Sequence, residues 1–102
     1  MLFIETPIFT KQASGGLFTD KELKQLQNEL LEDPNKGDLI TGSGGLRKVR
    51  LASKNKGKSG GFRVIYYRST REIIFLLLAY SKNKQDNLTK SEIKTLRELI
   101  DG

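Results

Sequence analysis

The stretch L-R-K-V-R-L-A-S-K-N-K-G-K-S-G-G-F-R-V-I-Y-Y-R-S-T-R-E-I-I-F-L-L-L-A-Y, residues 46–80, decides the fold that we predict for this chain. It contains three runs of β-branched, aromatic and other apolar residues that favour strands, at 46–52, 62–68 and 72–80. A Lys- and Gly-rich loop joins the first two runs, and a short turn joins the last two. These runs predict a three-stranded antiparallel meander. The third run is apolar on both faces, which indicates an inner, covered strand.

The first run places its charged residues on defined faces. Because successive side chains of a strand point to opposite faces, Lys48 and Arg50 share one face with Leu46. The residues between them, Arg47 and Val49, point to the other face. Two cations are therefore expected side by side on one surface of the sheet.

Outside this stretch, the N-terminal part predicts one strand and two helices. Residues 2–5 favour a short strand, and Thr6 followed by Pro7 is a typical helix start, with the helix reaching to about Gln12. The pattern from Thr19 to Glu22 is a capping box, and leucines at helical spacing follow it. This second helix is expected to end near residue 33, before a proline.

The remaining segments complete the predicted fold. Leu39 and Ile40 favour one extended step, and Thr89 to Glu92 is a second capping box at the start of a C-terminal amphipathic helix. We therefore predict one domain, residues 1–102, of the α+β class. It has a small, mostly antiparallel β-sheet with N-terminal helices and a C-terminal helix packed on it.

The composition excludes several kinds of chemistry. The chain has no Cys and no His, which rules out disulfides, thiolate metal sites and histidine-based triads. The carboxylates do not cluster in the sequence, so we expect neither a metal site nor a cofactor. The longest apolar run, residues 73–80, is too short to cross a bilayer, and the start does not resemble a signal peptide. We expect a soluble cytoplasmic protein without a membrane partner.

The glycine clusters do not predict a nucleotide-phosphate loop. G-S-G-G at 42–45 precedes a strand, whereas such loops precede a helix N-terminus. We interpret these glycines as turn residues that adopt positive φ.

The positive charge is concentrated in one part of the chain. Nine basic residues and no acidic one lie between Arg47 and Arg71, while the whole chain carries +6, so the remainder is net negative. A local basic patch of this kind is typical of a polyanion-binding surface, and nucleic acid is the first candidate.

Such residues suit one reaction, which is metal-independent cleavage of RNA. The 2′-hydroxyl attacks the adjacent phosphate, so a base, an acid and cations that stabilise the phosphate are required. Arg suits the phosphate role through its bidentate guanidinium. Lys can act as a base when neighbouring cations and burial lower its pKa, and Tyr can exchange a proton or stack on a base.

Three blocks carry a resemblance to a known family. They are G-G-L-R-K, G-G-F-R-V-I-Y-Y and Y-S-K-N-K-Q-D, in this order, with F-I-E-T-P-I-F near the N-terminus. With these blocks the chain closely resembles the HigB-type toxins of the RelE/ParE toxin–antitoxin superfamily over nearly its whole length. The resemblance implies an mRNA interferase that cuts messenger RNA in the ribosomal A site and thereby inhibits translation.

The resemblance also implies partners and site residues. The partners are mRNA, the ribosome and a helix-turn-helix antitoxin that covers either the basic face or the C-terminal helix. We expect a monomer when the toxin is free and a hetero-oligomer with the antitoxin. The expected catalytic set is Arg63, Tyr80, Lys82, Lys48 and Arg50. The expected RNA- or ribosome-binding set is Arg47, Lys54, Lys56, Lys58 and Arg68.

The chain departs from the RelE pattern at two positions. Asn83 stands where relatives carry a second arginine, and Thr89 stands where they carry a late tyrosine. The general base and acid therefore stay open, with Tyr80 and Lys82 as the substitutes. Two other functions also stay open, namely a non-catalytic RNA- or ribosome-binding module and a ParE-like gyrase inhibitor.

Overall fold

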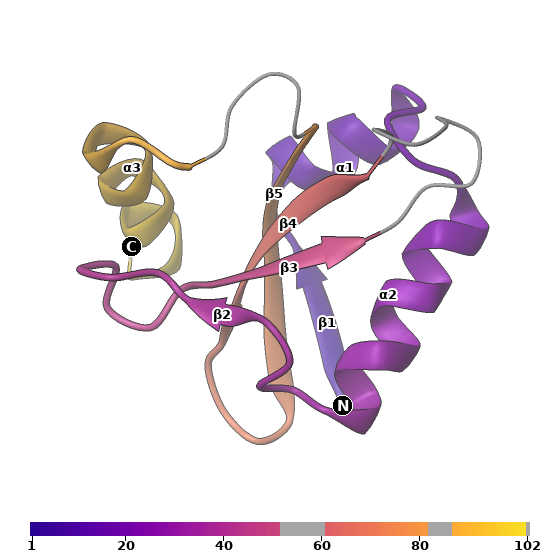
Figure 1. Cartoon of the computed structure of the whole chain (residues 1–102), viewed down its shortest axis with the longest axis horizontal. Coiled ribbons are helices and arrows are strands. Elements are labelled where there is room, and N and C mark those ends of the chain that lie inside the picture. Colours follow the sequence, from indigo (N-terminus) through magenta and orange to yellow (C-terminus); the bar gives the residue numbers. More distant parts are fainter. Residues whose placement is uncertain (52–60, 82–86, 102) are drawn as a thin grey trace.

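The computed structural model describes residues 1–51, 61–81 and 87–101, which form an α+β fold (Figure 1). In chain order the elements are β1 (Leu2–Glu5), α1 (Pro7–Ser14), α2 (Asp20–Glu32), β2 (Asp38–Leu39), β3 (Arg47–Leu51), β4 (Phe62–Arg68), β5 (Ile73–Ser81) and α3 (Lys90–Asp101). Every element predicted from the sequence is present. The bounds differ by one or two residues, and α1 extends two residues beyond Gln12.

The sheet has five strands in the order β1-β5-β4-β3-β2. The pairs β2–β3, β3–β4 and β4–β5 are antiparallel, which confirms the predicted meander, and β1 pairs with β5 in parallel. The register shifts between Ile65 and Tyr66 of β4, where Leu77 of β5 is the extra residue. The sheet is thus mostly antiparallel, as the sequence predicts, and β5 is an inner strand.

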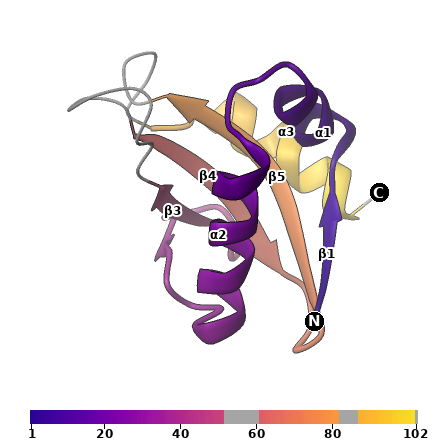
Figure 2. The same cartoon turned by 90° about the vertical axis from the view of Figure 1, so that its right-hand side faces the viewer.

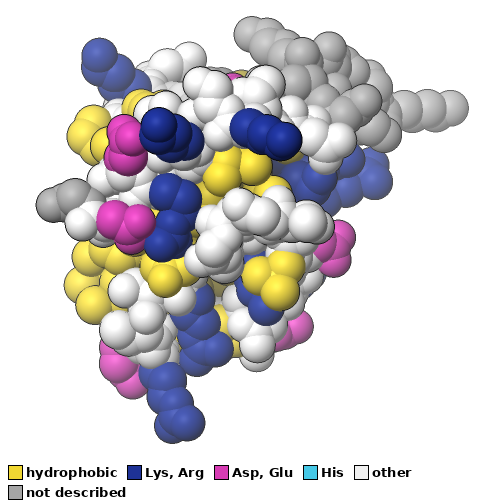
Figure 3. All heavy atoms as spheres, turned by 90° about the vertical axis from the view of Figure 1, so that its left-hand side faces the viewer, with side chains coloured by type: hydrophobic (Ala, Val, Ile, Leu, Met, Phe, Trp, Pro, Cys, Tyr) yellow, Lys and Arg dark blue, Asp and Glu magenta, His cyan; other side chains and the backbone are white. Residues whose placement is uncertain are grey.

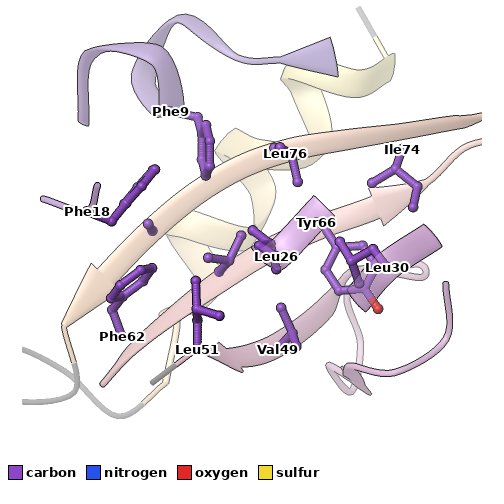
Figure 4. Close-up of a cluster of buried hydrophobic side chains, with 12 residues drawn as sticks. Phe9, Phe18, Leu26, Leu30, Val49, Leu51, Phe62, Tyr66, Ile74 and Leu76 are labelled. Atoms are coloured by element: carbon purple, nitrogen blue, oxygen red, sulfur yellow. The ribbon is translucent and has the colours of Figure 1, made fainter. Parts of the chain in front are cut away.

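The helices cover opposite faces of the sheet. Figures 1 and 2 show α1 and α2 on one side and α3 on the other. The α1/α2 side contains the larger core, to which α2 contributes Leu26 and Leu30 and β3 contributes Val49 and Leu51 (Figure 4). The Phe18 ring lies between the rings of Phe9 and Phe62, with both centroid distances 5.3 Å.

A second core lies between the sheet and α3. Leu96 of α3 packs there with Leu46, Ile65, Leu77 and Tyr80. Leu46 is in this cluster and Val49 is in the other one, so the predicted alternation of faces along β3 is confirmed. Lys48 and Arg50 follow Leu46 onto the α3 side.

The start of each helix follows its capping residue. The Thr6 hydroxyl accepts from Phe9 N–H, and Thr19 and Glu22 form the complete capping box of α2. Thr89 and Glu92 exchange the same two hydrogen bonds before α3. Local sequence therefore determines where each helix begins.

Helix α1 takes the place of a strand beside the second half of β5. After β1 ends, Thr6 N–H donates to Leu76 O and the Thr6 hydroxyl donates to Leu77 O. The Gln12 side chain then accepts from Ala79 N–H at 2.9 Å and donates to Ala79 O at 2.6 Å. These contacts satisfy backbone groups that would otherwise lack a partner at this edge.

Two further expectations concern local conformation and the membrane. Gly42, Gly44 and Gly45 have positive φ, as expected for turn glycines. No helix in residues 1–51, 61–81 and 87–101 has the length and apolar character needed to cross a membrane.

Candidate nucleic-acid interface

Two arginines lie directly opposite each other on the α3 side of the sheet. Arg50 of β3 pairs with Arg63 of β4, and Arg63 pairs in turn with Tyr80 of β5. Like charges at opposed positions repel each other in a free protein. Neither guanidinium forms an ion pair within the described part of the chain. The arrangement is therefore suited to an anion that bridges the two.

These arginines line a hollow of about 260 Å³ together with Lys48 and Asp38, which we call the basic hollow. Arg50 is exposed and Arg63 is half-buried. The Arg63 Nη1 atom is buried and has no hydrogen-bond partner among the described residues. Because an unpaired buried charged donor is costly, it favours a ligand that accepts a hydrogen bond there. Figure 3 shows Lys and Arg side chains lying among hydrophobic patches on this side of the molecule.

Lys48 connects the basic hollow to the segment before α3. Its Nζ donates to Asn87 Oδ1 at 3.0 Å, and its cross-strand partner on β2 is Asp38. Cross-strand partners present their side chains on the same face, so Asp38 lies beside the three cations. The structure thus brings together Lys48, Arg50 and Arg63 from the expected catalytic set.

Tyr80 lies next to this set but is mostly buried. Its exposed fraction is 7%, and the ring belongs to the core beneath α3. Tyr80 also lines a separate hollow of about 220 Å³ with Gln12 and Glu92. The Tyr80 ring therefore packs in the core between the sheet and α3.

Arg47 points to the opposite side of the sheet. Its Nη1 donates to Gly37 O at 2.6 Å and to Asn35 O at 3.2 Å. The Tyr66 hydroxyl holds the same loop, because it accepts from Gly37 N–H and donates to Pro34 O, both at 2.9 Å. Burial raises the pKa of Tyr66 above its ordinary value of 10.0. These two residues position β2, and with it Asp38.

The other expected binding residues do not join the basic hollow in the described structure. Arg68 lies at the far end of β4, opposite Ile74 of the α1/α2-side core. Lys54, Lys56, Lys58 and Lys82 lie outside the described residues, as does Asn83. Thr89 is the capping residue of α3, so a structural role accounts for the departure at that position.

Sequence reasoning missed two residues at this surface, Asp38 and Asn87. Asp38 precedes the extended step predicted at Leu39, and only the pairing of β2 with β3 shows that it faces Lys48. Asn87 lies in a polar segment that gives no signal of its contact with Lys48.

The described residues contain no group of three or more acidic side chains that could hold a metal ion.

Comparison with known protein families identifies the family of this chain. Residues 2–101 match the family described as the RelE toxin of the RelE/RelB toxin–antitoxin system. Because the match covers nearly the whole chain, this protein belongs to that family. RelE-family toxins have a cognate antitoxin as a partner and are generally ribonucleases. The resemblance to the superfamily and the α+β fold are confirmed at this level.

Proposed function

We propose that this protein is the toxin of a type II module of the HigB branch and cleaves mRNA in the ribosomal A site. The observation that carries the proposal is the pair of opposed guanidiniums of Arg50 and Arg63 in the basic hollow, neither of which forms an ion pair with a described residue. Membership of the RelE family supports the same function.

The proposed reaction needs no metal. The 2′-oxygen of one ribose attacks the adjacent phosphorus while its proton passes to a base, and the bond from phosphorus to the 5′-oxygen breaks. An acid protonates the departing 5′-oxygen, so the products are a 2′,3′-cyclic phosphate and a 5′-hydroxyl. Arg50 and Arg63 stabilise the phosphate charge that grows in the transition state.

The remaining residues divide between proton transfer and binding. Lys48, Tyr80 and Lys82 are the candidates for proton transfer, and Lys48 is the one that the described structure places in the basic hollow. The lysines of the 53–61 loop are proposed to contact RNA or ribosome. The toxin acts in the cytoplasm as a monomer and is neutralised by a helix-turn-helix antitoxin.

A non-catalytic RNA-binding module is the second candidate. It is favoured by the burial of Tyr80, because the basic hollow then binds phosphate without a clearly accessible tyrosine acid. A gyrase inhibitor has less support, since Arg63 and Tyr80 are retained together at neighbouring positions.

Cleavage mapping tests the proposal. A defined mRNA is incubated with the protein, with and without translating ribosomes, and new 5′ ends are located by primer extension. We expect in-frame cuts that leave 5′-hydroxyls and that need ribosomes. Arg63→Ala is expected to lower the rate about 100- to 1,000-fold, which is typical of losing one transition-state charge partner.

Controls separate catalysis from binding. Arg71→Ala removes an exposed arginine in the β4–β5 turn and should leave the rate unchanged. RNA binding without cuts in wild type would favour the binding module, and gyrase-dependent DNA breaks would favour the third function. Equal losses in Arg63→Ala and Arg71→Ala would contradict the role given to Arg63.

A further inference from the structure

A second hollow adjoins the basic hollow and shares Asp38 and Lys48 with it. It lies between the β2–β3 pair and the start of α3. Its volume of about 390 Å³ falls within the range of about 300–1,000 Å³ that is typical of pockets for small organic groups. A ligand held by Arg50 and Arg63 can therefore extend into it past Lys48.

The second hollow differs in chemistry from the basic hollow. Ile40, Leu88 and Ile93 give it apolar walls, and all three also pack against the core beneath α3. Apolar surface with polar groups beside it is suited to the faces and edges of an unstacked nucleobase.

Asp38 stands where the two hollows meet. It is the one acidic residue among the described residues that line them, and within that part of the chain its side chain forms no ion pair or hydrogen bond. Lys48 and Lys90 line the second hollow as well, so its charge does not exclude a phosphate, and what Asp38 adds is a carboxylate acceptor. It accepts hydrogen bonds from the exocyclic amino groups of bases.

The hydrogen bond from Lys48 Nζ to Asn87 Oδ1 connects the walls of the second hollow. It joins β3 to the segment that carries Leu88, so the apolar wall has a fixed position relative to the phosphate-binding arginines. The distance between a bound phosphate and its base is then set by the protein.

We propose that the second hollow binds the nucleobase next to the phosphate held by Arg50 and Arg63. Asp38 makes it prefer bases that carry an exocyclic amino group, which are adenine, cytosine and guanine, over uracil. This inference rests on the proposed ribonuclease function and adds a specificity-determining residue to it.

The test varies the message and the protein together. Four messages carry each base in turn at every position around the mapped cut, and cleavage is measured with translating ribosomes. At one position beside the cut, wild type should prefer amino-bearing bases over uracil by about fivefold or more. Asp38→Ala should reduce this preference below about twofold, and Asp38→Asn should shift it toward uracil, because an amide also donates a hydrogen bond.

Two control variants isolate the contribution of the hollow. Glu72→Ala removes an exposed acid in the β4–β5 turn and should keep the preference of wild type. Leu88→Ala should slow cleavage of all four messages about threefold or more through lost stacking. Leu23→Ala, at a partly buried leucine of α2 on the other face of the sheet, should not slow it.

The outcomes are distinguishable. Cuts with the same base preference in wild type and Asp38→Ala overturn this inference alone. A uniform change for all four bases in Asp38→Ala also overturns it, since that result assigns Asp38 to general electrostatics. If wild type makes no ribosome-dependent cut, the proposed function fails and this inference fails with it.

Discussion

Tyr66 shows how one buried hydroxyl supports the candidate site. The side chain is fully buried in the α1/α2-side core, and its hydroxyl bonds Gly37 N–H and Pro34 O at the loop before β2. The loop backbone passes so close that a Cβ on Gly37 would lie 2.8 Å from the Tyr66 ring. Only glycine fits there, and β2 starts at the next residue.

We expect Tyr66→Phe to lower the free energy of unfolding by about 1–3 kcal/mol, because two backbone groups lose their partner. The alkaline pH dependence should change as well. The raised pKa means that the folded state prefers the neutral phenol, so its contribution is complete below pH 10.0 and falls as the pH rises through the folded pKa. Urea unfolding from pH 7 to 11 measures both effects.

Tyr67→Phe is the matched control for this prediction. The Tyr67 ring packs under the Arg97 guanidinium at 5.0 Å, and its hydroxyl forms no hydrogen bond with described residues. This variant should keep both the stability and the alkaline profile of wild type. A profile for Tyr66→Phe that equals wild type would show that the Tyr66 phenol does not control alkaline stability.

At the scale of elements, α1 occupies the position of a neighbouring strand beside the second half of β5. Gln12 provides one donor and one acceptor to Ala79, as a neighbouring strand would. Ala79 immediately precedes Tyr80, and Val64, its partner on β4, immediately follows Arg63. The Gln12 contacts therefore hold the end of β5 that adjoins the candidate site.

Gln12→Ala should leave both Ala79 backbone groups without their partner. We expect a loss of about 1–3 kcal/mol in unfolding free energy and faster amide exchange in residues 77–81. Hydrogen exchange with mass spectrometry measures the second effect. Gln25→Ala, at an exposed position on α2, should change neither quantity, and unchanged exchange in Gln12→Ala would contradict the role of α1.

The helices and strands could be predicted from local sequence patterns. The candidate site could be predicted only in part, because it depends on pairing between residues that are distant in the sequence. Capping residues and strand alternation placed the helices and the faces of Lys48 and Arg50 correctly. The role of Arg47 in RNA binding stays a prediction, and its contact with the loop carbonyls could not be predicted, because it depends on how β2 returns across β3. Asp38 was missed for the same reason. Sequence distance gives no information about which short segment pairs with an edge strand.

At the scale of the whole molecule, the two faces of the sheet have different tasks. The α1/α2 side contains the larger core, while the α3 side combines a smaller core with the basic hollow. Substitutions on the α1/α2 side should therefore change stability more than RNA binding. Substitutions in the basic hollow should change RNA binding more than stability. The basic window of the sequence is divided between the faces, since Arg68 lies with the α1/α2-side core and Arg50 does not.

This division predicts which arginines govern the salt dependence of RNA binding. Each phosphate contact on single-stranded RNA contributes about 0.7 to the slope of log affinity against log salt concentration. Arg50→Ala should reduce that slope by about 0.7, because Arg50 is exposed at the basic hollow. Arg68→Ala removes the same charge from the other face and the far end of β4, so its slope should equal that of wild type. Fluorescence anisotropy with a short single-stranded RNA, between about 50 and 200 mM salt, measures both slopes. Equal reductions would mean that RNA follows the whole basic window rather than one face, and the site would then extend well beyond the hollow that Arg50 and Arg63 line.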